Sequence, residues 1–313
     1  MPLAPPRPDD EVFKLRDASS YDPVVLEFDR WTTRFTAPLA EKLVSLADLR
    51  GGHEVLDVGA GTGIVAFAAA PRVQPRGRVL GVDLSPAMLD TAAAKARQAG
   101  LANIAFERMD AEKLQIRDAS FDAVLSLYAL LHFPHPDLAL REMFRVLRPG
   151  GTLVIAVGSG PPRTPAGLIH RALRAPDLLR RRRGRLLLAP QFLDSLVEKY
   201  LPAPAEPEET ALAAENRNRT RSVPRLVRAA GFTAVRTCWE GRADCIQSPA
   251  DFWDLQRTYS SISRKRLASA PPETAEILKR DFFEQCRQVQ ERGGRLMRHH
   301  AAFYVVARRP LKP

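Results

Sequence analysis

The sequence has little cysteine, no long apolar run and only 7% aromatic residues. The three cysteines, Cys238, Cys245 and Cys286, form no Cys-x-x-Cys pair, which argues against a disulfide framework and against a zinc site. No stretch approaches the ~20 consecutive apolar residues of a membrane span. The first ten residues also lack the apolar core of a secretory signal. We therefore expect a cytoplasmic protein with no membrane span and no metal site.

Positive charge is abundant and unevenly placed. The formal net charge is +11 and the isoelectric point is about 10.0. Residues 1–160 carry a net charge of −2, whereas residues 161–313 carry +13. A strongly basic chain is typical of nucleic-acid-binding proteins. Here the excess lies outside the half that holds the recognisable motifs, so it favours an anionic small molecule or carrier over nucleic acid.

Between residues 53 and 157, short apolar runs alternate with amphipathic segments of helical length. This alternation is typical of βαβ units and a mostly parallel sheet. Ser85 and Pro86 indicate a helix start, Pro71 is expected to end the preceding helix, and Asp137 is expected to cap a later one. The expected strands are 54–58, 78–82, 103–108, 121–127 and 152–157.

After Gly158 the pattern changes to helices at 166–200 and a Pro/Glu-rich linker at 201–209. A helix–turn–strand unit then occupies 223–239, and a final strand is expected at 301–307. We expect four parts: an N-terminal helical lead or lid (1–52), a core (53–160), a basic helical insertion (161–222) and the end of the core sheet (223–313). The last part holds a helical insertion at 249–292.

The segment Val55-Leu-Asp-Val-Gly-Ala-Gly-Thr-Gly63 places three glycines directly after a strand and before a helix. Glycines at 59, 61 and 63 let the backbone approach a ligand without a Cβ, and the helix N-terminus behind them suits a carboxylate. Dinucleotide-binding proteins prefer Gly-x-Gly-x-x-Gly, but Ile64 stands at the position of the last glycine. The spacing Gly-x-Gly-x-Gly therefore argues against a dehydrogenase.

Two further aspartates end neighbouring strands. Asp83 lies about 20 residues past the turn, where a carboxylate can accept hydrogen bonds from both hydroxyls of a ribose. Asp110 follows the third strand, where alone it would be an ordinary turn residue. In series with the glycine turn, both predict a nucleoside-containing ligand.

These features resemble the class I S-adenosylmethionine-dependent methyltransferases, in particular the ubiquinone and menaquinone C-methylating type. Phe121-Asp-Ala-Val-Leu-Ser126, Leu131-His-Phe133 and Arg145-Val-Leu-Arg-Pro-Gly-Gly151 support the resemblance, which covers residues 53–157 well. It implies a Rossmann-like, doubly wound, seven-stranded α/β sheet in the order 3-2-1-4-5-7-6, with the last strand antiparallel and with helical insertions. It also implies S-adenosyl-L-methionine at the carboxyl ends of the strands, with Asp110 accepting from the adenine amino group. The residues that it places around this cofactor are Tyr21, Asp57, Gly59, Ala60, Gly61, Gly63, Asp83, Leu84, Met88, Asp110, Ala111 and Ser126.

The sequence indicates the methyl acceptor less clearly than the cofactor. Ser126-Leu-Tyr-Ala-Leu-Leu-His132 stands where methyltransferases of nucleic-acid amino groups carry Asn/Asp-Pro-Pro-aromatic, and no Pro-Cys pair marks a cytosine C5 enzyme. The run Arg180–Arg183 could contact phosphates, but no aromatic residue for base stacking lies between Phe144 and Phe192. We expect a small-molecule methyl acceptor, aromatic or polyketide-like, with residues 161–222 as its cap and nucleic acid disfavoured.

His132 is the candidate general base, because the loop after the fourth strand faces the methyl group in this architecture; it could equally pack under the following helix. Phe252, Trp253 and Tyr259 could line an acceptor pocket or form an ordinary helix core. The alternatives to small-molecule methylation are an RNA or protein methyltransferase that docks through its basic half, and a catalytically inactive cofactor-binding module. The sequence leaves the atom methylated and the choice between monomer and homodimer open.

Overall fold

The computed structural model describes residues 8–162, 164–201 and 223–311. The chain folds into two compact units. The first unit comprises residues 1–157, 208–238 and 303–313, and the second comprises 158–207 and 239–302. In the described residues, no helix has the length and apolar character needed to cross a membrane.

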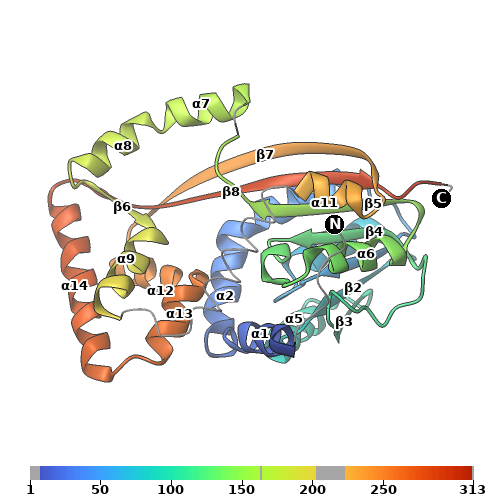
Figure 1. The fold of residues 1–313 in the computed structure, drawn as a ribbon, viewed down its shortest axis with the longest axis horizontal. Helices are drawn as coiled ribbons and strands as arrows, with labels where there is room; N and C mark the ends of the chain where they lie inside the picture. Colours follow the sequence, from blue (N-terminus) through green and yellow to red (C-terminus); the bar gives the residue numbers. More distant parts are fainter. Residues whose placement is uncertain (1–7, 163, 202–222, 312–313) are drawn as a thin grey trace. The chain divides into compact units, whose positions relative to one another are not determined.

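The first unit is an α/β arrangement that begins with helices and continues as alternating strands and helices (Figure 1). Its helices before the sheet are α1 (Pro8–Ser19), the 3-10 turn η1 (Asp22–Val24), α2 (Val25–Trp31), the π-helical turn η2 (Thr32–Thr36) and α3 (Ala37–Leu46). Then follow β1 (Glu54–Val58), α4 (Ile64–Val73), β2 (Arg78–Asp83), α5 (Pro86–Gln98), β3 (Ile104–Arg108), β4 (Phe121–Leu127), η3 (Leu130–His132), α6 (Pro136–Val146), β5 (Leu147–Gly158) and α11 (Val223–Ala229). The strands β7 (Thr233–Ile246) and β8 (Arg295–Arg308) begin or end in this unit.

The sheet has the order β3-β2-β1-β4-β5-β8-β6, and β7 also pairs with β8. Strands β1 to β5 are parallel to their neighbours, with Glu54 opposite Arg78 and Val55 opposite Ala123. Gly150, near the start of β5, and Arg309, just after β8, are joined by a hydrogen bond of 2.9 Å, so these two strands run antiparallel. The predicted doubly wound order and the antiparallel last strand are thus confirmed, since the expected sixth and seventh strands are β7 and β8.

Several local predictions were wrong. An extra short strand, β6 (Leu186–Ala189), lies in the stretch that was expected to be helical, and it pairs in parallel with the start of β8. Pro71 does not end α4, which continues to Val73 with the proline inside it. The N-cap of α6 is His135, with Asp137 in the first turn instead of at the cap. The strand β6 was missed because its three consecutive leucines show neither the alternation of a strand nor the spacing of an amphipathic helix, so the sequence does not distinguish the two.

The central strands of the first unit are largely apolar because helices cover both faces of the sheet there. β4 is buried at every position except Asp122, as expected for a central parallel strand. Helix α3 packs on α4, and α6 packs on α11. The core cluster includes Leu56, Val124, Leu140, Met143, Val227 and Val305.

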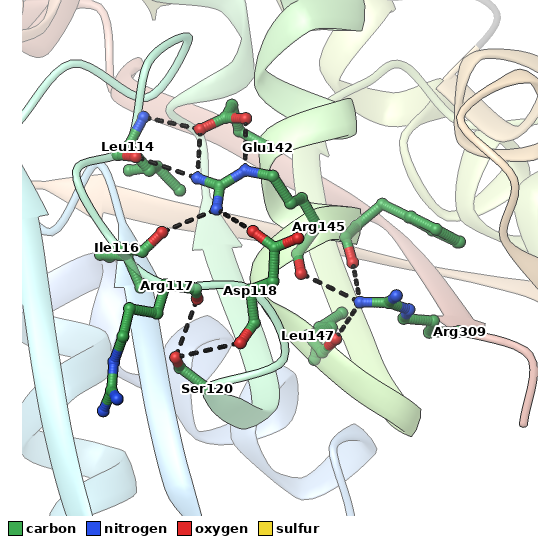
Figure 2. Close-up of polar contacts among 10 residues, drawn as sticks. Leu114, Ile116, Arg117, Asp118, Ser120, Glu142, Arg145, Leu147 and Arg309 are labelled. Carbon is green, nitrogen blue, oxygen red and sulfur yellow. Dashed lines mark hydrogen bonds and ion pairs between the residues drawn. The ribbon is translucent and has the colours of Figure 1, made fainter.

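Arg145 on α6 anchors the loop that leads from β3 to β4 (Figure 2). Its guanidinium donates to both carboxylate oxygens of Glu142 at 2.8 and 2.7 Å and to Asp118 at 2.6 Å. It also donates to the carbonyl oxygens of Leu114 and Ile116 at 2.9 and 2.7 Å. All five donors of the planar fork therefore meet acceptors: two go to Glu142 on the same helix and three go to the loop that also contains Asp110.

The second unit is mainly helical. It contains α7 (Pro165–Leu173), α8 (Ala175–Arg182), β6, α9 (Gln191–Tyr200), α12 (Pro249–Tyr259), α13 (Ser261–Ala268) and α14 (Pro272–Glu291), together with parts of β7 and β8. The expected helical stretch 249–292 is three helices. Its core holds an aromatic cluster of Phe192, Phe252 and Phe282, whose ring centroids lie 4.9 to 6.3 Å apart.

We predict that Arg145→Met lowers the free energy of unfolding by about 2 kcal/mol, because it leaves the carboxylate of Glu142 and two loop carbonyls without their charged donor. Urea denaturation followed by circular dichroism measures the change. Arg141→Met on the same helix is the control: Arg141 is largely exposed and meets only Asp137 at 3.4 Å, so its loss should change stability by less than about 0.5 kcal/mol. Equal effects of the two substitutions would contradict the anchoring role.

Candidate active site

The glycine turn after β1 folds back on the end of β2. Gly59, Gly61 and Gly63 have φ values of +72°, +52° and +87°, a region that side chains with a Cβ disfavour. The N–H groups of Gly59 and Ala60 donate to the carbonyl oxygen of Val82 at 2.8 and 3.0 Å. The turn is therefore held by backbone hydrogen bonds, and its left-handed residues require glycine.

The first two glycines of the turn differ in their surroundings. A Cβ on Gly59 would lie 2.2 Å from the Cβ of Ala129, so packing alone requires glycine there. A Cβ on Gly61 would meet only the ring of Phe28, at 3.7 Å. Packing alone therefore does not require glycine at position 61, where the left-handed φ of +52° does.

Asp83 is the hydrogen-bonding centre of the candidate site. One carboxylate oxygen accepts from the N–H of Gly61 at 2.8 Å, and the other accepts from the N–H of Ser85 at 3.0 Å. Burial raises the pKa of Asp83, and these backbone donors oppose the rise. Each oxygen keeps a second lone pair, so the carboxylate can accept two further hydrogen bonds side by side.

Asp57 lies behind the turn, inside the sheet. It is 1% exposed and accepts a hydrogen bond from the N–H of Ala66 in α4 at 3.1 Å. Burial raises the pKa of Asp57 to about 8, and the nearby Asp83 contributes to the rise. Asp57 thus ties β1 to the first turn of α4.

Asp110 faces the N-terminal helix α1. One of its oxygens accepts from the N–H of Glu112 at 2.9 Å, and the other lies 2.5 Å from the ammonium of Lys14. Lys14 also contacts Glu112 at 3.2 Å. Its hydrogen bond to Asp110 and the charge of Glu112 raise the pKa of Lys14 despite its burial. Ala111, the next residue, is buried.

Three ionisable residues at helical spacing on α1 each contact an ionisable side chain of the first unit outside α1. Asp10 lies 2.7 Å from His135, Lys14 pairs with Asp110, and Asp17 lies 2.7 Å from His132. Positions 10, 14 and 17 share one face of a helix. We call these three pairs the α1 ion-pair row. The sequence analysis did not identify Asp10, Lys14 and Asp17. Their spacing indicates a shared helical face, but their partners lie about 100 residues away in the sequence, so the contacts could not be predicted.

His132 is held by two residues of the N-terminal lead. Its Nδ1 faces the carboxylate of Asp17, and the ring of Tyr21 meets it edge-on with 6.0 Å between centroids. The imidazole is 41% exposed, so it does not pack under the following helix as a core residue would. If Nδ1 carries the proton that Asp17 accepts, Nε2 keeps the lone pair that a base needs.

The remaining predicted residues occupy the same end of the sheet. Ser126 is fully buried and donates to the carbonyl oxygen of Val58 at 2.9 Å, which joins β4 to β1. The N–H of Met88 donates to the N-cap hydroxyl of Ser85, as the helix start predicted. Leu84 lines a hollow of about 440 Å³ together with residues of α1 such as Leu15.

The aromatic residues considered for the acceptor, Phe252, Trp253 and Tyr259, lie in the second unit, as does His299. Phe252 is fully buried, and Trp253 packs edge-on against Phe282 at 5.0 Å, so both belong to a helix core. His299 lies 3.6 Å from Asp177, and burial lowers its pKa to about 4. Within the described residues, no group of three His, Cys, Asp or Glu side chains could hold a metal ion.

Comparisons with known proteins find methyltransferases. Residues 55–151 match the family described as "Methyltransferase domain". The aklanonic acid methyltransferase DauC of Streptomyces sp. (strain C5) is 33% identical over 144 residues, which are 46% of this chain and 66% of that protein. The ubiquinone/menaquinone biosynthesis C-methyltransferase UbiE of Pseudomonas putida is 40% identical over 119 residues, 38% of this chain and 46% of that protein. The chain thus spans about two thirds or less of these relatives.

A solved structure shows the same fold. The putative methyltransferase of Bacillus halodurans C-125 superposes with a TM-score of 0.50 and 23% sequence identity, over 87% of this chain and 98% of that one. Together with the glycine turn and the strand order, these matches identify the core. The chain carries a methyltransferase domain of the class I, S-adenosylmethionine-dependent type.

Proposed function

We propose that this protein transfers a methyl group from S-adenosyl-L-methionine to a small organic acceptor, aromatic or polyketide-like. The observation that carries the proposal is the row of aspartates at the ends of β1, β2 and β3 around the Gly59–Gly63 turn. The relatives DauC and UbiE, named for aklanonic acid and for ubiquinone and menaquinone biosynthesis, support a small-molecule acceptor.

The residues of the turn fit an adenosyl cofactor. In the proposal, the free lone pairs of Asp83 accept from the two ribose hydroxyls, and Asp110 accepts from the adenine amino group. Gly61 has no Cβ that would keep a ligand from the backbone, and Ala60, Leu84, Met88 and Ala111 supply apolar contact. Tyr21 covers the methionine end. The cofactor supplies an electrophilic methyl group on a sulfonium.

The chain's contribution to the reaction is orientation and, where the acceptor must lose a proton, a base. Holding the two reactants in line can supply much of the rate. In the proposal, Asp17 fixes the tautomer of His132 by accepting from Nδ1, and Nε2 of His132 receives the acceptor's proton. That residues 161–222 select the acceptor stays a prediction, since 163 and 202–222 lie outside the described residues.

The central experiment incubates the protein with methyl-labelled S-adenosylmethionine and separate fractions of metabolites, RNA and protein. Label is expected in a metabolite. Asp83→Ala should weaken binding of S-adenosylhomocysteine by about 2–4 kcal/mol, because it removes a charged acceptor of two hydrogen bonds. Isothermal titration calorimetry measures that affinity.

Asp90→Ala, a change of an exposed carboxylate on α5, is the matched control and should leave the affinity unchanged. Label found in RNA or protein would mean that the methyl acceptor is a macromolecule and not a metabolite. Tight cofactor binding without any transfer would indicate an inactive module. Undiminished affinity of Asp83→Ala would refute the ribose placement.

We predict that His132→Gln lowers kcat about 100-fold and leaves the affinity for S-adenosylhomocysteine within about threefold. His135→Gln is a close control, because His135 also pairs with a carboxylate of α1, Asp10, at 2.7 Å. Steady-state kinetics over pH 5–9 measure both. If the two variants lose activity equally, His132 only positions α1 and is no base.

We also predict that Lys14→Met strengthens binding of S-adenosylhomocysteine roughly tenfold, because Lys14 competes with adenine for the carboxylate of Asp110. Titration calorimetry gives the change, and Lys42→Met, an exposed lysine on α3, is the control. Weaker binding by Lys14→Met would mean that the lysine closes α1 over the ligand and does not compete with it.

A further inference from the structure

Helices α7 and α8 of the second unit present large apolar side chains to solvent. Among the described residues ten such side chains are exposed, and half of them lie on these two helices. Their exposed fractions range from 50% to 74%, and the residues are Leu168, Ile169, Leu173, Leu178 and Leu179. Single exposed leucines need no explanation, but a group on two consecutive helices marks an interaction surface.

Other residues of these helices contact the rest of the second unit. His170 packs edge-on against Trp239 with 4.7 Å between ring centroids. Arg174 donates to the carbonyl oxygen of Arg242 at 2.7 Å. His299 contacts Asp177. His170 lies on α7, Arg174 lies between the two helices and Asp177 lies on α8, so both helices contact the rest of the second unit, while their leucines are exposed.

The same two helices and the residues just after them carry a dense positive charge. Residues 165–185 contain seven arginines and one acidic residue, Asp177. Asp177 is already paired with Arg180 at 2.9 Å. Arg181, Arg182 and Arg183 are exposed. Residues 165–185 therefore combine exposed leucines with unneutralised guanidinium groups; we call this region the α7–α8 surface.

We propose that the α7–α8 surface binds the interface of an anionic lipid bilayer, with its helices lying in the plane of the membrane. Leucines next to arginines are the chemistry of interfacial helices: the apolar side chains enter the boundary of the acyl region, and the cations meet lipid phosphates. The arginine stems can add apolar contact while the charged ends stay in water. Neither helix is long enough to span the bilayer, so the helices lie on it.

Other occupants fit this surface less well. Nucleic acid would satisfy the arginines but not the five exposed apolar side chains, and residues 145–191 offer no aromatic side chain for base stacking. A second copy that met this surface with its own would bring its exposed Arg181, Arg182 and Arg183 against those of the first copy, at a cost in repulsion. A lipid surface supplies both an apolar layer and a high density of negative charge.

The test is co-sedimentation of the full chain with vesicles of phosphatidylcholine, with and without about 30% phosphatidylglycerol. Binding is expected only with the anionic lipid and should fall steeply in high salt. Replacing Arg181 and Arg182 together by Gln should weaken binding roughly 30-fold, which corresponds to about 1 kcal/mol for each cation at a membrane surface. Leu173→Ser should weaken it roughly tenfold.

The control for charge replaces Lys279 and Arg280, exposed on α14, by Gln, and the control for apolar area is Leu26→Ser, a leucine that is 72% exposed on α2. Both should bind as the unaltered protein does, and all variants should melt at the same temperature. Absence of vesicle binding, equal binding to neutral vesicles, or equal losses in the controls would overturn the proposal. So would retention by RNA in place of vesicles, or a dimer in sedimentation that Leu173→Ser disperses.

Discussion

The convergence of carboxylates at one edge of the sheet is the constraint on which the site depends. Parallel strands in this order bring the ends of β1, β2 and β3 side by side, so Asp57, Asp83 and Asp110 belong to the same edge. Burying negative charges near one another is costly unless donors compensate. The chain supplies these donors from its backbone at Ala66, Gly61 and Ser85, and from Lys14. The glycine turn is therefore shaped as much by this electrostatic need as by the approach of a ligand.

The same constraint explains the position of α1. Asp110 is only partly buried, and the loop that carries it also contains Glu112, so the two carboxylates attract a cation. Lys14 meets that need, while Asp10 and Asp17 on the same helical face meet the two histidines of the loop after β4. Charge complementarity over one face of α1 thus orients the helix. A helix held by polar pairs can be released by a ligand that offers the same groups better partners.

The core could be predicted from the sequence because its signals are local. The runs at β1 and β4 were predicted to the residue, since a strand buried on both faces is apolar throughout and ends at a turn residue. The strand order came from the resemblance of the motifs between residues 53 and 157. The short strand β6 was missed because three leucines fit a helix equally well, and only pairing with β8 makes them a strand. The α1 ion-pair row was missed for a related reason: the charges at 10, 14 and 17 read as a solvated helix face until the fold brings Asp110, His132 and His135 beside them.

The uneven charge of the chain can now be assigned to particular elements. The acidic excess of residues 1–160 includes the aspartates that end the strands and those on α1. Part of the basic excess of residues 161–313 lies on the α7–α8 surface, where Arg181, Arg182 and Arg183 are exposed close to exposed leucines. Repulsion among like charges destabilises a compact chain, so a surface that keeps Arg181, Arg182 and Arg183 together is costly to the isolated protein. The exposed apolar side chains carry a similar cost in water. Both costs fall on the same surface, and both are relieved by one kind of partner, an anionic apolar surface.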